Sequence, residues 1–86
     1  MSNYRVALTA SAEKELNWLP AKLITRIVGR LEKLASDPRP PGCKKLVGGD
    51  KQWRLRVGDW RVVYEIDDKA KTVDVTRIAH RREVYE

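Results

Sequence analysis

The sequence predicts an α+β fold in which a helical hairpin packs on one face of a mainly antiparallel, four-stranded sheet. Three observations predict it: an alternating apolar segment near the start, two stretches with helical apolar spacing after it, and three alternating segments close together in the second half. The order strand, helix, helix, strand, strand, strand places both helices on one side of one sheet. A chain of 86 residues has room for one modest core, so we expect a single domain over residues 1–86.

The first half of the chain contains one predicted strand and two predicted helices. Tyr4–Thr9 alternates as a half-buried strand does, and Thr9 or Ser11 can cap the helix that follows. Pro20 is expected in the first turn of the second helix, where its missing N–H removes no helical bond. "SDP" at Ser36–Pro38 ends that helix. Its apolar stripe consists of Leu23, Ile24, Ile27, Val28, Leu31, Leu34 and Ala35.

The second half contains a loop rich in proline and glycine and then three predicted strands. Gly58-Asp59 has glycine first, which favours a type II′ turn between the first two of these strands. A short helix is expected at the C-terminus, after the last strand. The three strands span Gln52–Val57, Trp60–Asp67 and Thr72–Ile78.

The two-residue turn fixes which side chains face each other. Arg56 then lies opposite Arg61, with Arg54 one pleat away on the same face, and Glu65 is the nearest carboxylate on this hairpin. Like charges opposite each other destabilise a strand pair. One interpretation is a solvated face that discourages edge-to-edge pairing. The other is a phosphate cradle, because guanidinium groups bind phosphate oxygens in pairs.

The C-terminal stretch "AHRREVYE" adds groups that can transfer protons. Histidine has an unperturbed pKa that allows proton transfer near neutral pH, which makes His80 a candidate, and Tyr85 can act as an acid or base if nearby cations lower its pKa. Together with Arg81 and the hairpin arginines, these side chains are the groups needed to cleave RNA through its 2′-OH. The alternative interpretation is a frayed polar terminus.

Composition limits the class of protein. The formal net charge is +6 and the pI is about 9.8, which favours a polyanionic partner, nucleic acid first and an acidic protein second, although charge also serves solubility. A single cysteine and a single histidine argue against a disulfide, a metal site and a metal cofactor. No signal peptide and no apolar run of membrane-spanning length is present, so a cytoplasmic location without a membrane partner is expected.

Three segments resemble the RelE/ParE superfamily of small toxins, and more closely its RelE branch. They are "YRVALTASAEKELNWLP", "KKLVGGDKQWRLRVGDWRVVYEI" and "IAHRREVYE", which together span most of the chain. The resemblance implies a type II toxin with the RelE fold. Such a toxin cleaves mRNA in the A site of the 70S ribosome as an endoribonuclease without metal or cofactor, and so inhibits translation. It also implies a cognate antitoxin, acidic and partly disordered, through which the complex binds operator DNA.

The resemblance also implies roles for individual residues. Arg61 matches the arginine expected to hold the scissile phosphate, Arg81 the one expected to stabilise the transition state, and Tyr85 the tyrosine that orients or activates the 2′-OH. Arg54 and Arg56 stand where founding members have lysines.

This substitution of arginine for lysine affects the expected chemistry. Arginine stays protonated, so Arg54 and Arg56 suit electrostatic roles better than proton transfer. Proton transfer is then left to His80, to Tyr85 or to solvent, with Glu65 a weaker candidate.

Two further expectations concern binding. Lys44, Lys45 and Lys51 read as a solvated loop, but on a ribosome they can contact rRNA phosphates and so join the arginines as RNA-binding candidates. The alternative function is that of a ParE-like toxin, which inhibits DNA gyrase by binding and cleaves nothing.

Overall fold

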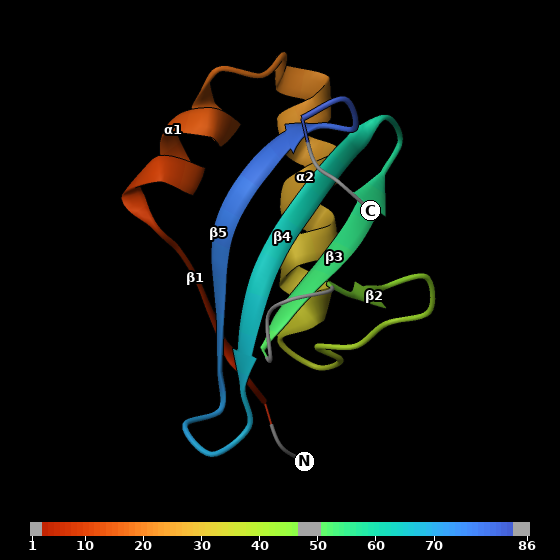
Figure 1. Cartoon of the computed structure of the whole chain (residues 1–86). Coiled ribbons are helices and arrows are strands. Elements are labelled where there is room, and N and C mark those ends of the chain that lie inside the picture. Colours follow the sequence, from red (N-terminus) through yellow and green to blue (C-terminus); the bar gives the residue numbers. More distant parts are fainter. Residues whose placement is uncertain (1–2, 47–50, 84–86) are drawn as a thin grey trace.

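The computed structural model describes residues 3–46 and 51–83. Two helices lie against one face of a single sheet (Figure 1). No helix within these residues is long and apolar enough to cross a membrane. The elements are β1 (Arg5–Leu8), α1 (Ala10–Asn17), α2 (Ala21–Leu34), β2 (Lys44–Lys45), β3 (Gln52–Val57), β4 (Trp60–Asp67) and β5 (Thr72–His80).

Within residues 3–46 and 51–83 the sheet has five strands, in the order β1-β5-β4-β3-β2. Among these described strands only β1 and β5 pair in parallel, so the predicted α+β class with a mainly antiparallel sheet is confirmed. The predicted number of four strands was one too few. The additional strand, β2, pairs just Lys44 with Arg54 and Lys45 with Trp53. Two residues in a loop rich in proline carry no alternation by which a sequence could reveal a strand.

Local sequence signals set the ends of the helices. Thr9 is the N-cap of α1, and its Oγ1 accepts a hydrogen bond from the Ala12 N–H at 3.2 Å. Pro20 lies one residue before α2 instead of inside its first turn, and its carbonyl accepts from the N–H groups of Leu23 and Ile24. After α2, the Ser36–Pro38 segment ends the helix as predicted.

The core lies between the helices and the apolar face of the β3–β4 hairpin. Ile27 and Leu34 of α2 are fully buried, as are Val62 and Tyr64 of β4. The Tyr64 hydroxyl donates to the Pro38 carbonyl at 2.9 Å, which ties the loop after α2 to the sheet. Burial raises the pKa of this phenol, so it stays protonated and keeps donating.

β5 extends two residues beyond the predicted Ile78 and ends at His80. The register against β4 shifts between Val63 and Tyr64, which leaves Thr76 as the extra residue of a bulge. Past the bulge, α1 covers the edge of β5 in place of β1, and Glu15 Oε1 accepts from the Ile78 N–H at 2.9 Å. Residues 81–83 form a turn, and the remainder of the predicted C-terminal helix lies outside the described residues.

Two glycines should respond in opposite ways to substitution by alanine. Gly58 has φ +60° in the β3–β4 turn, so Gly58→Ala should lower the free energy of unfolding by about 1–2 kcal/mol. Gly29 lies inside α2 with open space at its Cβ position, so Gly29→Ala should raise it by about 0.5–1 kcal/mol. Urea denaturation of both variants measures the difference. Equal effects of the two substitutions would contradict this account of the turn.

Candidate functional site

The predicted register of the β3–β4 hairpin is confirmed. Arg56 pairs with Arg61, and Arg54 pairs with Val63, so the three arginines share one face. That face is not simply solvated, because Arg54 is 2% exposed and Arg61 is 6% exposed, whereas Arg56 is exposed. Two guanidinium groups are therefore held in partly dry surroundings, where their charge acts more strongly on a nearby anion than it does in water.

Two candidate arginines meet at the tip of this hairpin. The Arg61 Nη1 donates to the carbonyls of Gly58 and Trp60, at 3.1 and 3.0 Å. The Arg81 main-chain N–H donates to the Asp59 carbonyl at 2.8 Å, and Arg81 Nη1 lies 3.9 Å from Asp59 Oδ1. These main-chain acceptors fix the direction of the Arg61 guanidinium before any ligand arrives, which is the preorganisation that electrostatic catalysis requires.

A further cation at this turn was not identified from the sequence. The Arg26 guanidinium extends from α2 to Gly58, where its Nη1 is 3.7 Å from the position that a Cβ would occupy. The sequence places Arg26 only on the basic face of the second helix. Its contact with the hairpin depends on how α2 crosses the sheet, which helical periodicity does not reveal.

The structure places the His80 side chain apart from the hairpin arginines. His80 is the last residue of β5 and pairs with Trp60, and the two rings meet edge to face with centroids 5.5 Å apart. Trp60 packs against the helix-side core, so His80 lies on the opposite face from Arg61. The sequence analysis placed His80 after the last strand, but β5 continues through His80, and strand alternation then sets its side. The His80 Nδ1 accepts from the Arg82 N–H at 3.3 Å, so a neutral ring carries its proton on Nε2.

The other predicted residues lie in three places. Lys44 and Lys45 form β2 beside β3, and Lys51 is exposed just before β3. Glu65 is four residues along β4 from Arg61, or about 13 Å at the usual strand rise, so it does not reach the hairpin tip. Tyr85 lies outside the described residues.

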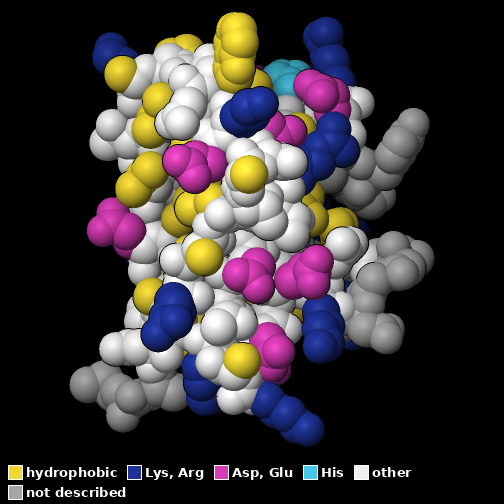
Figure 2. Space-filling view, turned by 90° about the vertical axis from the view of Figure 1, so that its left-hand side faces the viewer, with side chains coloured by type: hydrophobic (Ala, Val, Ile, Leu, Met, Phe, Trp, Pro, Cys, Tyr) yellow, Lys and Arg dark blue, Asp and Glu magenta, His cyan; other side chains and the backbone are white. Residues whose placement is uncertain are grey.

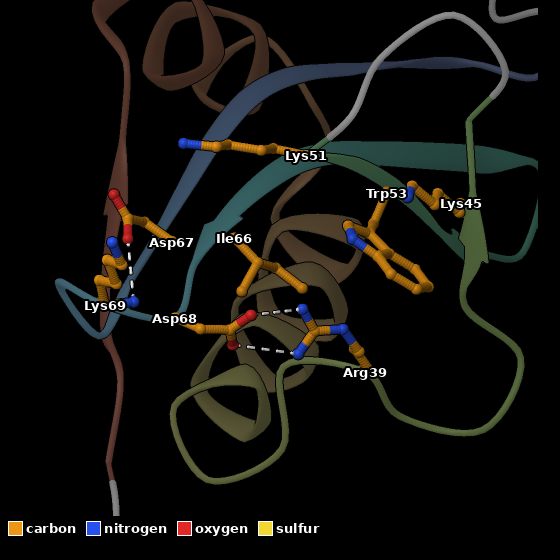
Figure 3. Close-up of a pocket in the computed structure, with 8 residues that line it drawn as sticks. All are labelled: Arg39, Lys45, Lys51, Trp53, Ile66, Asp67, Asp68 and Lys69. Atoms are coloured by element: carbon orange, nitrogen blue, oxygen red, sulfur yellow. Dashed lines mark hydrogen bonds and ion pairs between the residues drawn. The ribbon is translucent and has the colours of Figure 1, made fainter.

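A pocket of about 400 Å³ at the other end of the hairpin holds a group of paired charges (Figure 3). Asp68 accepts from both terminal nitrogens of Arg39, at 3.2 and 2.9 Å, and from the Tyr4 hydroxyl at 2.6 Å. The Arg39 guanidinium also lies over the Trp53 ring, 5.2 Å from its centroid. These bonds lower the pKa of Asp68 to about 2, with the Arg39 hydrogen bond the largest cause. We call this set the Asp68 clamp, because it joins the loop after α2 to the β4–β5 turn.

A second concavity is apolar and lies on the face formed by β1, α1 and α2. It encloses about 480 Å³, and hydrophobic side chains are visible on that side of the molecule among acidic and basic ones (Figure 2). Neither this groove nor any other part of residues 3–46 and 51–83 brings together three or more His, Cys, Asp or Glu side chains that could hold a metal ion. The groove is lined by Val6, Leu8, Leu16, Val28, Leu31, Glu32 and Ala35.

Taken together, these features define a small, basic α+β protein whose candidate site is an arginine cluster at the tip of a central hairpin. A sequence model of the family described as "ParE toxin of type II toxin-antitoxin system, parDE" matches residues 6–85. The chain is 30% identical to toxin RelG of Mycobacterium tuberculosis, over 95% of both chains. It is 35% identical to toxin RelE of the same organism, over 95% of this chain and 86% of that one.

Solved structures agree with this relationship. A RelE–RelB complex from the archaeon Pyrococcus horikoshii OT3 contains a chain that superimposes with a TM-score of 0.84 and 28% identity, over 98% of this chain and 100% of that one. The chain belongs to the RelE/ParE family of toxins from type II toxin–antitoxin systems.

The Asp68 clamp predicts a specific pH dependence of stability. Asp68→Asn should lower the free energy of unfolding at pH 7, because the charged partner of Arg39 is lost. An Asp has a pKa of about 3.9 when unfolded. A pKa held below this value stabilises the fold above pH 4, and that contribution disappears as the pH falls toward the folded-state value of about 2. Urea denaturation from pH 7 to pH 2 should therefore show the variant and the original protein converging.

Arg39→Gln is the matched variant for this test, because it removes the other half of the pair. Its stability should converge with that of the original protein over the same pH range. A difference that persists unchanged at pH 2 for both variants would show that the clamp does not act through the charge of Asp68.

Proposed function

We propose that the protein is a ribosome-dependent endoribonuclease that cleaves mRNA in the ribosomal A site and so inhibits translation. The observation that carries this proposal is the position of Arg61, oriented by main-chain carbonyls at the hairpin tip beside Arg56 and Arg81. Three guanidinium groups around one turn suit a phosphate whose negative charge increases during the reaction. A ribosomal substrate also places the site of action in the cytoplasm.

The reaction begins with attack of a ribose 2′-oxygen on the adjacent phosphorus. The bond from phosphorus to the 5′-oxygen of the next nucleotide breaks, giving a cyclic 2′,3′-phosphate and a free 5′-hydroxyl. The 2′-OH must lose a proton and the leaving oxygen must gain one. Arg61 holds the non-bridging oxygens in this scheme, and Arg81 offsets the charge that develops on them.

Proton transfer is assigned to Tyr85 in this proposal. Arginine cannot exchange protons near neutral pH, and His80 packs on Trp60 on the opposite face of the sheet. Tyr85 follows Arg81 by four residues, so the chain can bring it to the same end of the hairpin. A tyrosine with cations nearby has a lowered pKa and can serve as acid or base.

Dependence on the ribosome is expected because, among the described residues, few proton-transfer groups lie at the hairpin tip. Holding the codon in a near-attack geometry can supply a large part of the rate enhancement, and an A site presents one codon in a fixed position. Lys44, Lys45 and Lys51 lie beside β3, where contacts with rRNA phosphates would add affinity that falls with salt.

An antitoxin is the proposed protein partner. The Pyrococcus horikoshii structure is that of a RelE–RelB complex, which supports a similar pairing here. An acidic, partly disordered antitoxin would match the net charge of +6 and could bury apolar side chains in the groove between β1 and the helices. Through this antitoxin the complex would bind operator DNA.

Inhibition of DNA gyrase is the second candidate function, because the matching family model is that of the ParE toxin. A ParE-like protein would act by binding alone. The arginine cluster would then contact an acidic protein surface or DNA rather than a scissile phosphate.

Alanine substitutions at the hairpin tip test the main proposal. Arg61→Ala and Arg81→Ala should each lower the rate of A-site cleavage by about 10²–10³, because each removes one preorganised charge. The assay uses 5′-labelled mRNA on programmed ribosomes with an empty A site. Arg5→Gln is the matched control, because Arg5 is exposed on β1, at the far edge of the sheet, and should leave the rate unchanged.

Intact mRNA in this assay, with full cellular toxicity in both alanine variants, would exclude the nuclease. Altered plasmid topoisomers in the same cells would then favour the gyrase inhibitor. Cleavage of bare RNA without ribosomes would instead identify a self-sufficient ribonuclease.

The assignment of proton transfer predicts unequal effects at two residues. Tyr85→Phe should lower the cleavage rate by about 10²–10⁴, the usual contribution of general acid–base catalysis. His80→Gln should lower it only a few-fold, because that ring lies with Trp60 and away from Arg61. The same ribosome assay measures both variants. A larger loss of cleavage rate in His80→Gln than in Tyr85→Phe would contradict this assignment. Together with a rate that changes with pH around the pKa of a histidine, it would assign proton transfer to His80.

A further inference from the structure

A third concavity lies at the open edge of the sheet, beside β3. It has a volume of about 390 Å³ and adjoins the candidate site through Arg56, which lines it and also pairs with Arg61. We call it the edge pocket. Its lining residues are Arg30, Gly42, Cys43, Lys44, Arg54, Leu55 and Arg56.

The edge pocket exists because β2 covers only one end of β3. Gly42 has φ +92° and the Cys43 N–H donates to the Pro40 carbonyl at 3.1 Å, so the chain turns away from β3 just before β2 begins. The edge of β3 from Leu55 onward is thereby left beside a hollow. α2 lies behind β3 and β4 (Figure 1). Its Arg30 lines the hollow.

The lining of the edge pocket is strongly cationic. Arg30 of α2, Lys44 of β2 and two arginines of β3 contribute charge, and its described lining includes no Asp or Glu. The pocket of Figure 3 differs, because its lining includes Asp67 and Asp68, and Asp68 pairs with Arg39. Basic side chains from three elements line this one concavity, and Arg30 and Lys44 bring to it a guanidinium and an ammonium group, which attract anions.

We propose that the edge pocket is a phosphate subsite that holds the RNA backbone at the nucleotide next to the scissile phosphate, with Arg30 and Lys44 as its anchoring residues. This inference rests on the ribonuclease function proposed above. Arg56 lies between the two sites, and directly opposed residues in a strand pair are about 5 Å apart. Successive phosphates of one strand can therefore contact Arg61 and the edge pocket at the same time. Guanidinium and ammonium groups bind phosphate oxygens whatever the base sequence is.

The single cysteine of the chain provides a direct test of anion binding. Cys43 lines the edge pocket, so its rate of alkylation by uncharged iodoacetamide reports whether the pocket is occupied. Pyrophosphate serves as the probe. It should slow alkylation of the original protein by several-fold at low salt and should have little effect on the double variant Arg30→Gln/Lys44→Gln.

Lys22→Gln/Lys33→Gln is the matched control for this test. It removes the same charge from exposed positions on α2 that do not line the pocket. Pyrophosphate should protect Cys43 in this control as it does in the original protein. Equal protection of all three proteins, or of none, would overturn the proposed anion site. Urea denaturation verifies that each variant is folded.

RNA with one uncharged linkage tests the role of the edge pocket in cleavage. A methylphosphonate that replaces the phosphate next to the scissile one should slow cleavage by the original protein about tenfold, and Arg30→Gln/Lys44→Gln should slow cleavage of natural RNA similarly. The double variant should cleave the methylphosphonate RNA no more slowly than it cleaves natural RNA, because the substitution and the linkage remove the same contact. The linkage on the other side of the scissile phosphate is the control.

The two experiments separate this inference from the proposed function. If the double variant loses a further factor in cleavage rate on the methylphosphonate RNA, the two changes act independently. With cleavage of natural RNA by the original protein intact, that result would support the ribonuclease and overturn the subsite. Protection of Cys43 by pyrophosphate without any RNA cleavage would retain the anion site and overturn the ribonuclease, and with it the role of the edge pocket in holding RNA.

Discussion

The two-residue turn at Gly58 and Asp59 fixes the register of β3 against β4, and both the core and the candidate site depend on that register. It directs Leu55, Val62 and Tyr64 toward the helices and the arginines to the opposite face. Its carbonyl groups also accept the hydrogen bonds of Arg61 and Arg81. A shift of one residue would exchange the two faces, so the same local geometry that builds the core also positions the guanidinium groups.

The repulsion between opposed arginines is reduced by main-chain acceptors. Like charges opposite each other in a sheet destabilise the pair by up to about 1 kcal/mol. The Arg61 guanidinium turns to the carbonyls of Gly58 and Trp60, whose negative ends partly offset its charge. This arrangement keeps the guanidinium in one orientation. An anion bound as proposed above would meet an Arg61 side chain that is already oriented.

Much of the fold could be predicted because its signals are local. Alternation defined β3 and β4, Thr9 capped α1, and glycine with positive φ closed the hairpin. The position of His80 could not be predicted in this way, since it depends on how far β5 extends. That length depends on a bulge and on Glu15, which accepts a hydrogen bond from Ile78, 63 residues later in the chain.

The candidate site was predictable to a similar extent. Hairpin register placed Arg56 opposite Arg61, and a two-residue turn is enough to show this. The contributions of Arg26 and Arg30 were not predictable, because they depend on where α2 crosses the sheet. Lys44 joined them only through β2, a strand too short to have a sequence pattern.

The parallel pairing of β1 with β5 has a consequence for the order of events during synthesis. Residues 5–8 pair with residues 72–75, so the first strand made must wait for the last before the sheet can close. Contacts between such distant segments slow folding, because most of the chain must be ordered before they can form. The Asp59 carbonyl likewise meets Arg81 only after β5 has been added. A nascent chain therefore lacks a complete arginine cluster until β5 and Arg81 have been synthesised. The candidate site of this toxin can assemble only at the end of its synthesis.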